Sequence, residues 1–522
     1  MCFLLLFSQA SLAGKWEFQP KLSLTETYYD NIGLASENKN KELVTQVMPG
    51  FSFSKKSRRI QLSSDYSFGY IKYLGNEFSD SSYNRASAAM SVEAIRRHFF
   101  INADASISQQ VVDPSQAYSS DVALVNNNQT EARTFSLQPR LANRFGRYAN
   151  SDLSYKRTFT NYSSEAVGSS RMSALQYNLS SGRWFKQLSW YANATHITSN
   201  QENAENSSAQ LRVDYNLSQH WTLFALGRAQ KNNYLTSNIS QTQDAVSRYY
   251  INPEAGVVWT ASRKLKIEAG GGATLNAGDL SDKKLTVEQP TWRASVNIAP
   301  SKRTTIFFGR ESSVFGDRKF FNLSLGTRHT NWTSGYAETL ITPQQLRISS
   351  ALSASSGSSS GLPSSPTSSS PFSPAPSGGG ITGVGFASGG ELGRAVTNDV
   401  ILRKRLDFSG TINRRKATLT GGAFHDIGEY QTSDISDKRY GMNGGVDFNM
   451  GRSMNWSNKA SAQRYYFDSR VDNIYTVNSS LSRKIKKHVS TSLEYQWQKR
   501  NTLVANAQYT AQQVSAKLNV AF

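Results

Sequence analysis

The chain has 522 residues, a net charge of +20 and hydrophobic residues at 38% of its positions. A mean hydropathy of −0.50 excludes a bundle of membrane-spanning helices, and no apolar run approaches the ~18 residues that one such helix needs. The same polarity suits a transmembrane β-barrel, because only alternate strand residues of a barrel meet lipid.

The first residues, MCFLLLFSQASLA, form an apolar run that ends in small residues. Ser11 and Ala13 suit secretory cleavage after Ala13, so we predict a signal peptide at residues 1–13 and a single barrel domain at 14–522. The basic region that opens a signal peptide is missing, which leaves an upstream start codon or a first strand as alternatives. Cys2 is the only cysteine, so the mature chain would have none, as suits passage through the periplasm.

From Trp16 onward, short segments alternate apolar and polar residues with a period of two, as in strands whose faces meet different solvents. Ala209, Leu211 and Val213, for example, alternate with Gln210 and Arg212. The connections alternate between tight turns and longer polar loops, which is typical of periplasmic turns and extracellular loops. The rhythm predicts an all-β fold, a closed antiparallel transmembrane barrel of about 24 strands (about 22 to 26), with both termini on the short-turn side.

Tryptophan positions support two aromatic belts at the membrane interfaces. Trp190 is an exception, because it is expected in the middle of a strand. The tryptophans expected beside short turns are Trp184, Trp221, Trp259, Trp332 and Trp456, and those expected nearer the long loops are Trp292 and Trp497.

Four residues conflict with regular strands. Pro49, Pro139 and Pro253 fall inside apparent strands of a barrel that has no free edge, and we interpret them as bulges or strand starts. Lys404 would face lipid at a cost of about 2–4 kcal/mol near the midplane, and a local bulge would remove that conflict.

Residues 343–396 interrupt the strands with a low-complexity segment rich in Ser, Gly and Pro. Such a composition buries too little apolar surface to offset the entropy of ordering. Its position in the alternation makes it an extracellular loop. We interpret it as a tolerated insertion, with a gate folded into the lumen or a polymer-contacting surface as alternatives.

Positive charge gathers at the short turns and predicts a basic periplasmic rim, which we call the basic rim. Its summed potential can concentrate an anionic polymer at a pore mouth, although ordinary solvated turns would carry the same residues. The basic rim comprises Lys55, Lys56, Arg58, Arg59, Arg96, Arg97, Arg263, Lys264, Lys302, Arg303, Arg414, Arg415, Lys416, Arg483, Lys484, Lys486 and Lys487.

The polar ladder expected to face the lumen carries charges of both signs among many Ser, Asn, Gln and Tyr residues. Such a lining exchanges hydrogen bonds with hydroxyl-rich solutes without strong net attraction, and water fits it equally well. The lumen-facing candidates are Arg212, Asp214, Arg293, Arg403, Arg405, Glu494 and Lys517.

Motifs for catalysis and metal binding are absent from the sequence. It contains no HExxH, cysteine cluster, acidic calcium loop or nucleophile elbow, which are the patterns that would indicate such sites. We therefore expect no enzymatic activity, no cofactor and no metal. We expect no nucleic-acid partner, because the basic turns lack a stacking platform and a recognition helix.

The chain ends in the alternating segment AQQVSAKLNVAF. Leu518, Val520 and Phe522 fall on one side of this last strand, and the ending resembles the C-terminal signal of bacterial outer-membrane barrels. That resemblance implies recognition by the barrel-assembly machinery and a place in the outer membrane among lipid and lipopolysaccharide.

The first 50 residues contain a distinctive set of positions. They are Trp16, Phe18, Pro20, Leu22, Leu24, Glu26, Tyr28, Asp30 and Asn31, then Leu43, Val44, Thr45, Val47, Pro49 and Gly50. With these residues the chain resembles the outer-membrane β-barrel family associated with PEP-CTERM and exosortase systems, and the resemblance continues through LRKRLDF at 402–408 to Phe522. The resemblance implies a Gram-negative outer-membrane protein that works beside exopolysaccharide biosynthesis and export, with exopolysaccharide and periplasmic export proteins as partners.

Three functions are consistent with these features. The first is a pore or scaffold for exopolysaccharide export, the second is a general solute porin, and the third is a structural or surface-anchoring barrel without transport. About 24 strands without a plug domain imply either a large opening or loops folded inside.

Overall fold

The computed structural model describes residues 15–75, 77–111, 117, 121–125, 128–164, 169–200, 205–237, 243–277, 285–313, 316–341, 401–430, 436–467, 470–504 and 507–522. The expected signal peptide at 1–13 and the Ser/Gly/Pro-rich loop at 343–396 lie outside these residues. Within them, every regular element is a strand. No helix of the described residues is long and apolar enough to cross a membrane.

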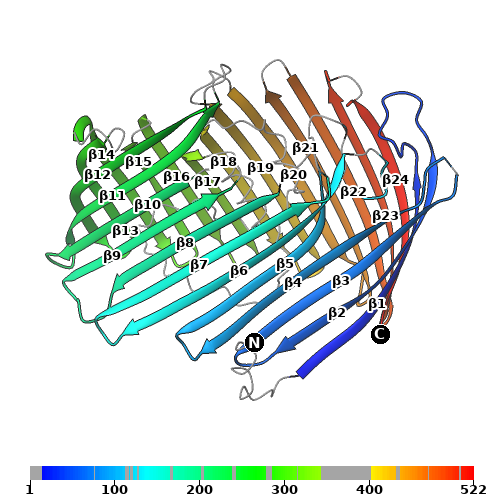
Figure 1. Cartoon of the computed structure of the whole chain (residues 1–522), viewed down its shortest axis with the longest axis horizontal. Helices are drawn as coiled ribbons and strands as arrows, with labels where there is room; N and C mark the ends of the chain where they lie inside the picture. The colour runs from blue at the N-terminus through cyan, green and yellow to red at the C-terminus, as the bar shows by residue number, and fades with distance from the viewer. Residues whose placement is uncertain are drawn as a thin grey trace.

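The strands lie side by side in chain order and are strongly tilted (Figure 1). They span Lys15–Tyr29 (β1), Glu42–Lys56 (β2), Ile60–Tyr73 (β3), Ser81–Ile95 (β4), Phe99–Val111 (β5), Gln129–Phe145 (β6), Ala149–Tyr162 (β7), Ser170–Ser181 (β8), Leu188–Ser199 (β9), Glu205–Asn216 (β10), Trp221–Ser237 (β11), Gln243–Ser262 (β12), Leu265–Ala277 (β13), Leu285–Ser301 (β14), Thr304–Ser313 (β15), Gly316–Gly326 (β16), Thr330–Ile341 (β17), Ile401–Asn413 (β18), Ala417–Tyr430 (β19), Ser436–Asn449 (β20), Met454–Phe467 (β21), Arg470–Lys486 (β22), Val489–Thr502 (β23) and Tyr509–Ala521 (β24).

The first and last strands close the barrel. They pair antiparallel from Lys21↔Ala521 to Tyr29↔Gln513, so the sheet has no free edge. All 24 strands belong to one sheet, which confirms the predicted closed antiparallel barrel. Closure satisfies the backbone groups of β1 and β24 that would otherwise be exposed to lipid without partners.

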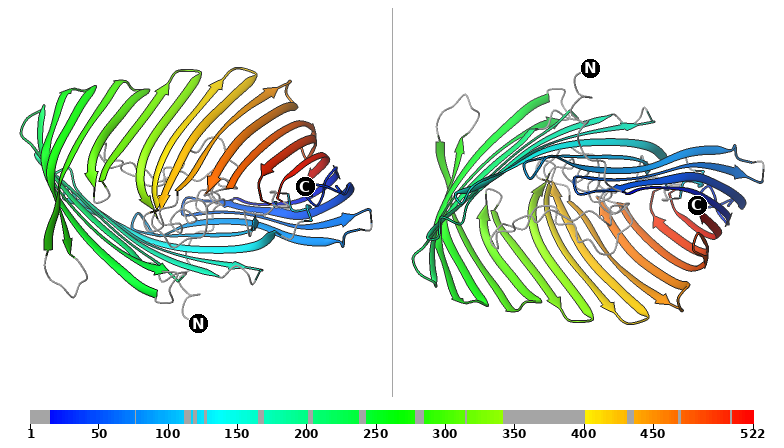
Figure 2. Two further views of the ribbon diagram at one scale, coloured as in Figure 1. Left: turned by 90° about the horizontal axis from the view of Figure 1, so that it is seen from above. Right: turned by 90° about the horizontal axis from the view of Figure 1, so that it is seen from below.

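The cross-section is elongated rather than round (Figure 2). Strands β11 to β13 turn through a tight bend at one end, and β24, β1 and β2 meet at the other. Between these ends run two broad walls, one of β4 to β9 and one of β14 to β22. We call the first end the corner and the second end the seam.

Pairing assigns every strand residue to one of two faces, because directly opposed residues in an antiparallel pair share a face. On the seam strands, Leu22 and Leu24 are about 40% exposed and pair with Val520 and Leu518. Their neighbours Thr25 and Thr27 pair with Lys517 and Ser515. The outer face is therefore apolar, and the inner face is polar.

Aromatic side chains collect on the outer face near the short turns, at the end where β1 begins and β24 ends. Trp221 stacks on Trp259 with centroids 6.1 Å apart, and Trp184 packs against Tyr148 at 5.8 Å. The expectation that Trp190 lies in mid-strand is wrong. Strand β9 begins at Leu188, so Trp190 also lies close to the short-turn end of its strand.

The three prolines are neither bulges nor strand starts. Pro49 pairs with Leu22 of β1, and the register between β2 and β3 is the same on both sides of it. At Pro49, two consecutive residue pairs between β2 and β3 are missing from the ladder. The same gap of two pairs toward the following strand occurs at Pro139 and at Pro253. Proline has no N–H to donate, so the ladder opens locally without shifting.

Lys404 faces outward in regular register, without the bulge that we considered. It is the fourth residue of β18, which begins at Ile401 after the long loop. Its Nζ lies 2.6 Å from Oε1 of Glu429 on the neighbouring strand. Lys404 is therefore paired near the extracellular end and does not carry the midplane penalty.

Candidate functional site: the barrel lumen

The corner holds a continuous set of buried and partly buried ion pairs on the inner face. We call it the corner network. Four arginines meet four carboxylates, so the set is neutral as a whole. Its members, from strands β10 to β16, are Arg212, Asp214, Arg228, Glu254, Glu268, Arg293, Glu311 and Arg318.

Glu268 and Arg293 are central to the corner network. Glu268, at 2% exposure, lies 3.1 Å from Nη2 of Arg212 and 3.4 Å from Nη1 of Arg293. Arg293 also contacts Glu311 at 2.7 Å and Glu254 at 3.4 Å. Carboxylates and guanidinium groups that are buried together offset the desolvation cost that either would bear alone.

The corner network depends on the tight bend of the sheet. Arg212 on β10 reaches Glu268 on β13, although β11 and β12 lie between them in the sheet. A flat sheet holds neighbouring strands ~4.8 Å apart, so these side chains would be far from one another. The sheet must curl around its inner face at this point, as Figure 2 shows.

Glycines make that curl possible. Phe224 on β11 pairs with Gly256, which pairs with Gly270 on β13. A Cβ at Gly256 would lie 2.6 Å from Phe224 Cζ, and one at Gly270 would lie 2.7 Å away. The Phe224 ring therefore lies across two strands that have no side chain there, with the Arg212 guanidinium 4.5 Å from its centroid.

A second group of ion pairs, the wall network, lies on β18 to β20. Asp426 is fully buried and is approached by Arg403 at 2.8 Å, Arg439 at 3.2 Å and Arg405 at 3.7 Å. Arg405 also contacts Asp407 at 2.7 Å. The guanidinium groups are held by carboxylates on the inner face.

A similar cluster follows on β22 and β23. Asp472 contacts Arg500 at 3.1 Å and also Arg470. Arg500 has no exposed side-chain surface. Ion pairs thus recur along the wall that runs from the corner toward the seam.

The opposite wall, β4 to β9, is lined mainly by hydroxyl and amide side chains. Asn193 donates to Oδ1 of Asn178 at 2.6 Å, and the hydroxyls of Thr134 and Thr160 are 3.2 Å apart. Arg140 and Asp152 form an ion pair at 2.6 Å on the same face. This wall offers many neutral donors and acceptors to a solute in the lumen.

The seam is filled on its inner side by an apolar cluster, the seam plug. Strand residues at the extracellular end of the seam pack there against residues from two loops. The described members are Tyr29, Ile32, Leu34, Val44, Ile71, Tyr73, Tyr83, Ala123, Leu124 and Tyr509.

Hydrogen bonds hold the loop residues of the seam plug in place. Tyr29 Oη donates to Asp121 Oδ2 at 2.7 Å, and Tyr73 Oη donates to the Ala123 carbonyl at 3.0 Å. The Val125 N–H donates to the Ile32 carbonyl at 3.2 Å, which joins the two loops. The sequence left open whether a wide barrel would have a large opening or loops folded inside it. At the extracellular end of the seam, loop residues are folded inside.

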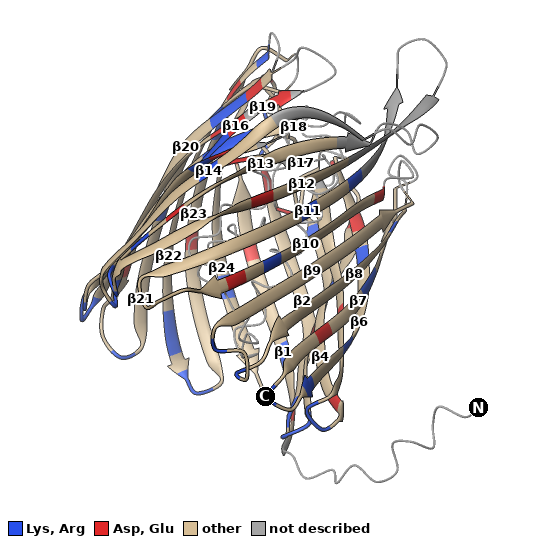
Figure 3. Cartoon of the chain, turned by 90° about the vertical axis from the view of Figure 1, so that its left-hand side faces the viewer, with Lys and Arg blue, Asp and Glu red and all other residues tan. Residues whose placement is uncertain are grey.

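The basic rim residues lie in or beside the short turns, at the end where the chain terminates (Figure 3). None of the short turns at this end contains Asp or Glu. Lys55 differs from the other members, because it is only 2% exposed. Its ammonium group lies 3.9 Å from the Trp16 ring centroid on the outer face, and the other rim residues are exposed.

The structure places all seven lumen-facing candidates on the inner ladder. It brings Arg212, Asp214 and Arg293 together in the corner network, and Arg403 and Arg405 in the wall network. Glu494 is exposed and accepts a hydrogen bond from Ser492 at 3.2 Å, and Lys517 lies opposite Thr25 near the seam.

Sequence reasoning missed the other members of the corner network, the wall network and the cluster on β22 and β23. They are Arg228, Glu254, Glu268, Glu311, Arg318, Asp407, Asp426, Arg439, Arg470, Asp472 and Arg500. Alternation within each strand would have assigned them to the inner face. Their contacts across several strands depend on the bend, which alternation does not reveal.

The C-terminal residues occupy the outer face of the seam. Leu518 pairs with Leu24, and Val520 pairs with Leu22. The Phe522 N–H donates to the Pro20 carbonyl at 2.9 Å, and the ring is 69% exposed.

Among the described residues, no group of three or more His, Cys, Asp and Glu could hold a metal ion.

Comparison with known proteins gives one family match and no curated relative. A family model described as "Protein of unknown function, DUF481" matches residues 151–318. No curated protein matches the chain in sequence.

Solved structures with a similar outline include an iron transporter, a siderophore receptor and an outer-membrane protein. The FrpB iron transporter from Neisseria meningitidis (F3-3 variant) is 10% identical, with a TM-score of 0.47 over 97% of this chain and 81% of that one. The siderophore receptor PirA from Acinetobacter baumannii is 9% identical, with a TM-score of 0.44 over 97% and 80%. A loop-deletion mutant of OmpT, an outer membrane protein of Vibrio cholerae, is 8% identical, with a TM-score of 0.30 over 98% and 100%. At these values the likeness carries no argument about ligands.

The geometry itself assigns the chain to a membrane. Its sheet closes on itself, its outer face is apolar with aromatic side chains near the short turns, and its inner face is polar and charged. A closed barrel is the form in which strands can cross a bilayer with every backbone group paired. The chain is a β-barrel of the bacterial outer membrane.

Proposed function

We propose that this barrel is a conduit or scaffold for export of an extracellular polysaccharide across the outer membrane. The observation that carries the proposal is the lining of the lumen. A wall of hydroxyl and amide groups faces a wall whose arginines are held by carboxylates. A sliding polysaccharide would exchange hydrogen bonds there with neutral hydroxyl and amide groups and with guanidinium groups whose charge neighbouring carboxylates offset.

The basic rim supports an anionic polymer in particular. Its exposed cations surround the periplasmic mouth, and no acidic residue interrupts the short turns. Such a ring raises the local concentration of a polyanion, and salt weakens this effect. The link to an exosortase system rests on the resemblance of the N-terminal strands alone.

Planar-bilayer recording tests this proposal. We expect alginate, an anionic polysaccharide, to block the ionic current reversibly when added on the short-turn side, with longer blocks for longer chains and weaker blocks in high salt. Dextran of matched length, which is neutral, should block more weakly. A current that ignores both polymers would contradict the proposal.

A general solute porin is the second candidate, and the seam plug favours it. Loop residues fill the inner side of the extracellular end beside β1 to β4, which narrows the way out for a polymer. A porin would pass small sugars while remaining insensitive to alginate. Liposome swelling with small sugars, measured beside the alginate block, distinguishes the two functions.

A further inference from the structure

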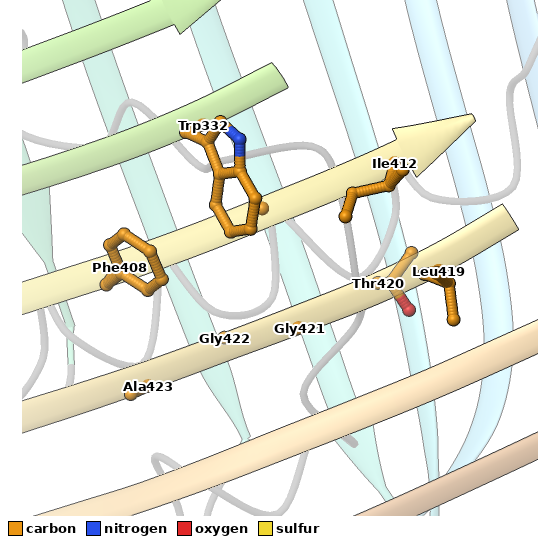
Figure 4. A pocket seen from close by; sticks show the side chains of 9 residues that line it. Trp332, Phe408, Ile412, Leu419, Thr420, Gly421, Gly422 and Ala423 are labelled. Carbon is orange, nitrogen blue, oxygen red and sulfur yellow. The ribbon is translucent and has the colours of Figure 1, made fainter. Parts of the chain in front are cut away.

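The outer face carries a hollow on β17 to β19 that the lumen account does not use. It encloses about 320 Å³ and is lined almost entirely by apolar surface. We call it the outer trough. Its lining is Trp332, Phe408, Gly410, Ile412, Leu419, Thr420, Gly421, Gly422 and Ala423 (Figure 4).

A row of glycines forms the floor of the outer trough. Trp332 pairs with Gly410, Gly410 with Gly421, and Gly421 with Gly444. A Cβ at Gly410 would lie 2.1 Å from the indole of Trp332, so the indole covers that glycine. At Gly421, and at Gly444 on β20 beside the trough, the nearest atom to such a Cβ is 3.9 Å away, so the floor is open at Gly421.

Larger side chains bound the outer trough along the strands. Ile412 and Leu419 are paired on its short-turn side, and Phe408 lies on the other side, 5.7 Å from Trp332 between ring centroids. These residues face the hydrocarbon of the bilayer. A lipid chain that lies in the trough would make the van der Waals contacts that the glycines, which have no side chains, leave unmade.

Cations stand directly beyond the short-turn end of the outer trough. Arg414, Arg415 and Lys416 form the turn that joins β18 to β19, and all three are exposed. The turn before β17 adds Arg328. The Asn413 N–H, at the end of β18, donates to the carbonyl of the neighbouring His329 at 2.7 Å, so the two turns lie side by side. The turns at 327–329, 414–416 and 450–453 contain no Asp or Glu.

We propose that the outer trough and the turn at 414–416 bind one anionic phospholipid of the periplasmic leaflet. The phosphate would lie against Arg414, Arg415 and Lys416, and an acyl chain would pass Ile412 and Leu419 into the trough. Gly421 is five residues from Lys416, or ~16 Å along an extended strand, a reach that suits a lipid chain below its headgroup. The inference concerns the lipid-facing surface and does not depend on what passes through the lumen.

Native mass spectrometry of the purified barrel with added phosphatidylglycerol or phosphatidylcholine tests the proposal. The wild type should retain phosphatidylglycerol better than phosphatidylcholine by about tenfold or more, because the three cations attract a headgroup with net negative charge and phosphatidylcholine has none. The variant R414Q/R415Q/K416Q should lose that preference. The matched control K484Q/K486Q/K487Q, which removes three cations in or beside the turn between β22 and β23, should keep it.

A second pair of variants tests the trough itself. Gly421→Leu fills the floor and should lower phosphatidylglycerol retention, because the leucine side chain takes the place of the acyl chain. Gly227→Leu adds the same side chain on the outer face of β11, where a Cβ meets nothing within 4 Å, and should leave retention unchanged. Heat-dependent migration on gels shows whether each variant is folded.

Three results would overturn the proposal. One is equal retention of phosphatidylglycerol and phosphatidylcholine by the wild type. Another is undiminished phosphatidylglycerol retention by folded Gly421→Leu. The third is loss of lipopolysaccharide rather than phosphatidylglycerol from the R414Q/R415Q/K416Q variant, which would place the phosphate source in the other leaflet.

Discussion

Replacing Glu268 by glutamine removes one charge from the centre of the corner network while keeping the size of the side chain. In the wild type four arginines face four carboxylates, and in the variant four face three. Breaking one partner of a buried ion pair costs about 3–5 kcal/mol. Arg212 retains Asp214 at 2.9 Å and Arg293 retains Glu311 at 2.7 Å, so we expect about 3 kcal/mol, the low end of that range.

Urea unfolding of the barrel in lipid vesicles, followed by tryptophan fluorescence, measures this loss. Glu494→Gln is the matched control, because Glu494 also faces the lumen but is exposed, and it should change the unfolding free energy by less than about 1 kcal/mol. In the double variant Arg212→Gln/Glu268→Gln, the losses should be less than additive. A Glu268→Gln variant as stable as Glu494→Gln would refute the claim that the corner network holds the bend.

Three further predictions concern the bend, the seam plug and the basic rim. Gly270→Val should lower the unfolding free energy by about 1–3 kcal/mol, because the new side chain would be overpacked against Phe224. Gly271→Val should lower it clearly less, since the nearest atom to a Cβ at Gly271 is 3.5 Å away. Equal losses for the two variants in the same urea assay would contradict the role of Phe224. Leu124→Asp should loosen the seam plug and raise the single-channel conductance. Leu503→Asp, at a loop position that is 80% exposed, should leave the conductance unchanged. An unchanged conductance for Leu124→Asp would show that the seam plug does not restrict the lumen. Four cations of the basic rim can be neutralised together, namely Arg263, Lys264, Lys302 and Arg303. This change should weaken the alginate block at low salt and have little effect at high salt, because salt screens exposed charges. An alginate block that is unchanged at low salt would show that the basic rim does not attract the polymer.

The barrel itself was predictable from the sequence because strand faces follow a period of two. The alternation of Leu518 and Val520 with Lys517 and Asn519 predicts a strand between lipid and water, and the pairing of β24 with β1 has that arrangement. Strand number followed from the rhythm of turns and loops, because each connection reverses the chain. Cross-strand ion pairs such as Arg212 with Glu268 could not be predicted, since they depend on how sharply the sheet curls.

Local exceptions were harder to interpret than the overall pattern. Pro49 suggested a bulge, yet missing hydrogen bonds are tolerated within an unbroken register. Lys404 suggested a conflict with lipid because sequence alone does not give depth in the membrane, and its partner Glu429 lies on the next strand. The seam plug was foreseen only as one of two possibilities, because loop residues such as Ile32 and Leu124 become a core only when two distant loops meet.

Cysteine labelling along β10 tests most directly whether the two faces of each strand meet different solvents. With Cys2 replaced by serine, single cysteines are introduced at Ser208, Ala209, Gln210 and Leu211, and the barrel in lipid vesicles is treated with a water-soluble maleimide. The account predicts labelling of the variants at 208 and 210, which face the lumen, and protection of those at 209 and 211, which face lipid. Equal labelling of all four positions, or labelling of 209 and 211 alone, would contradict it.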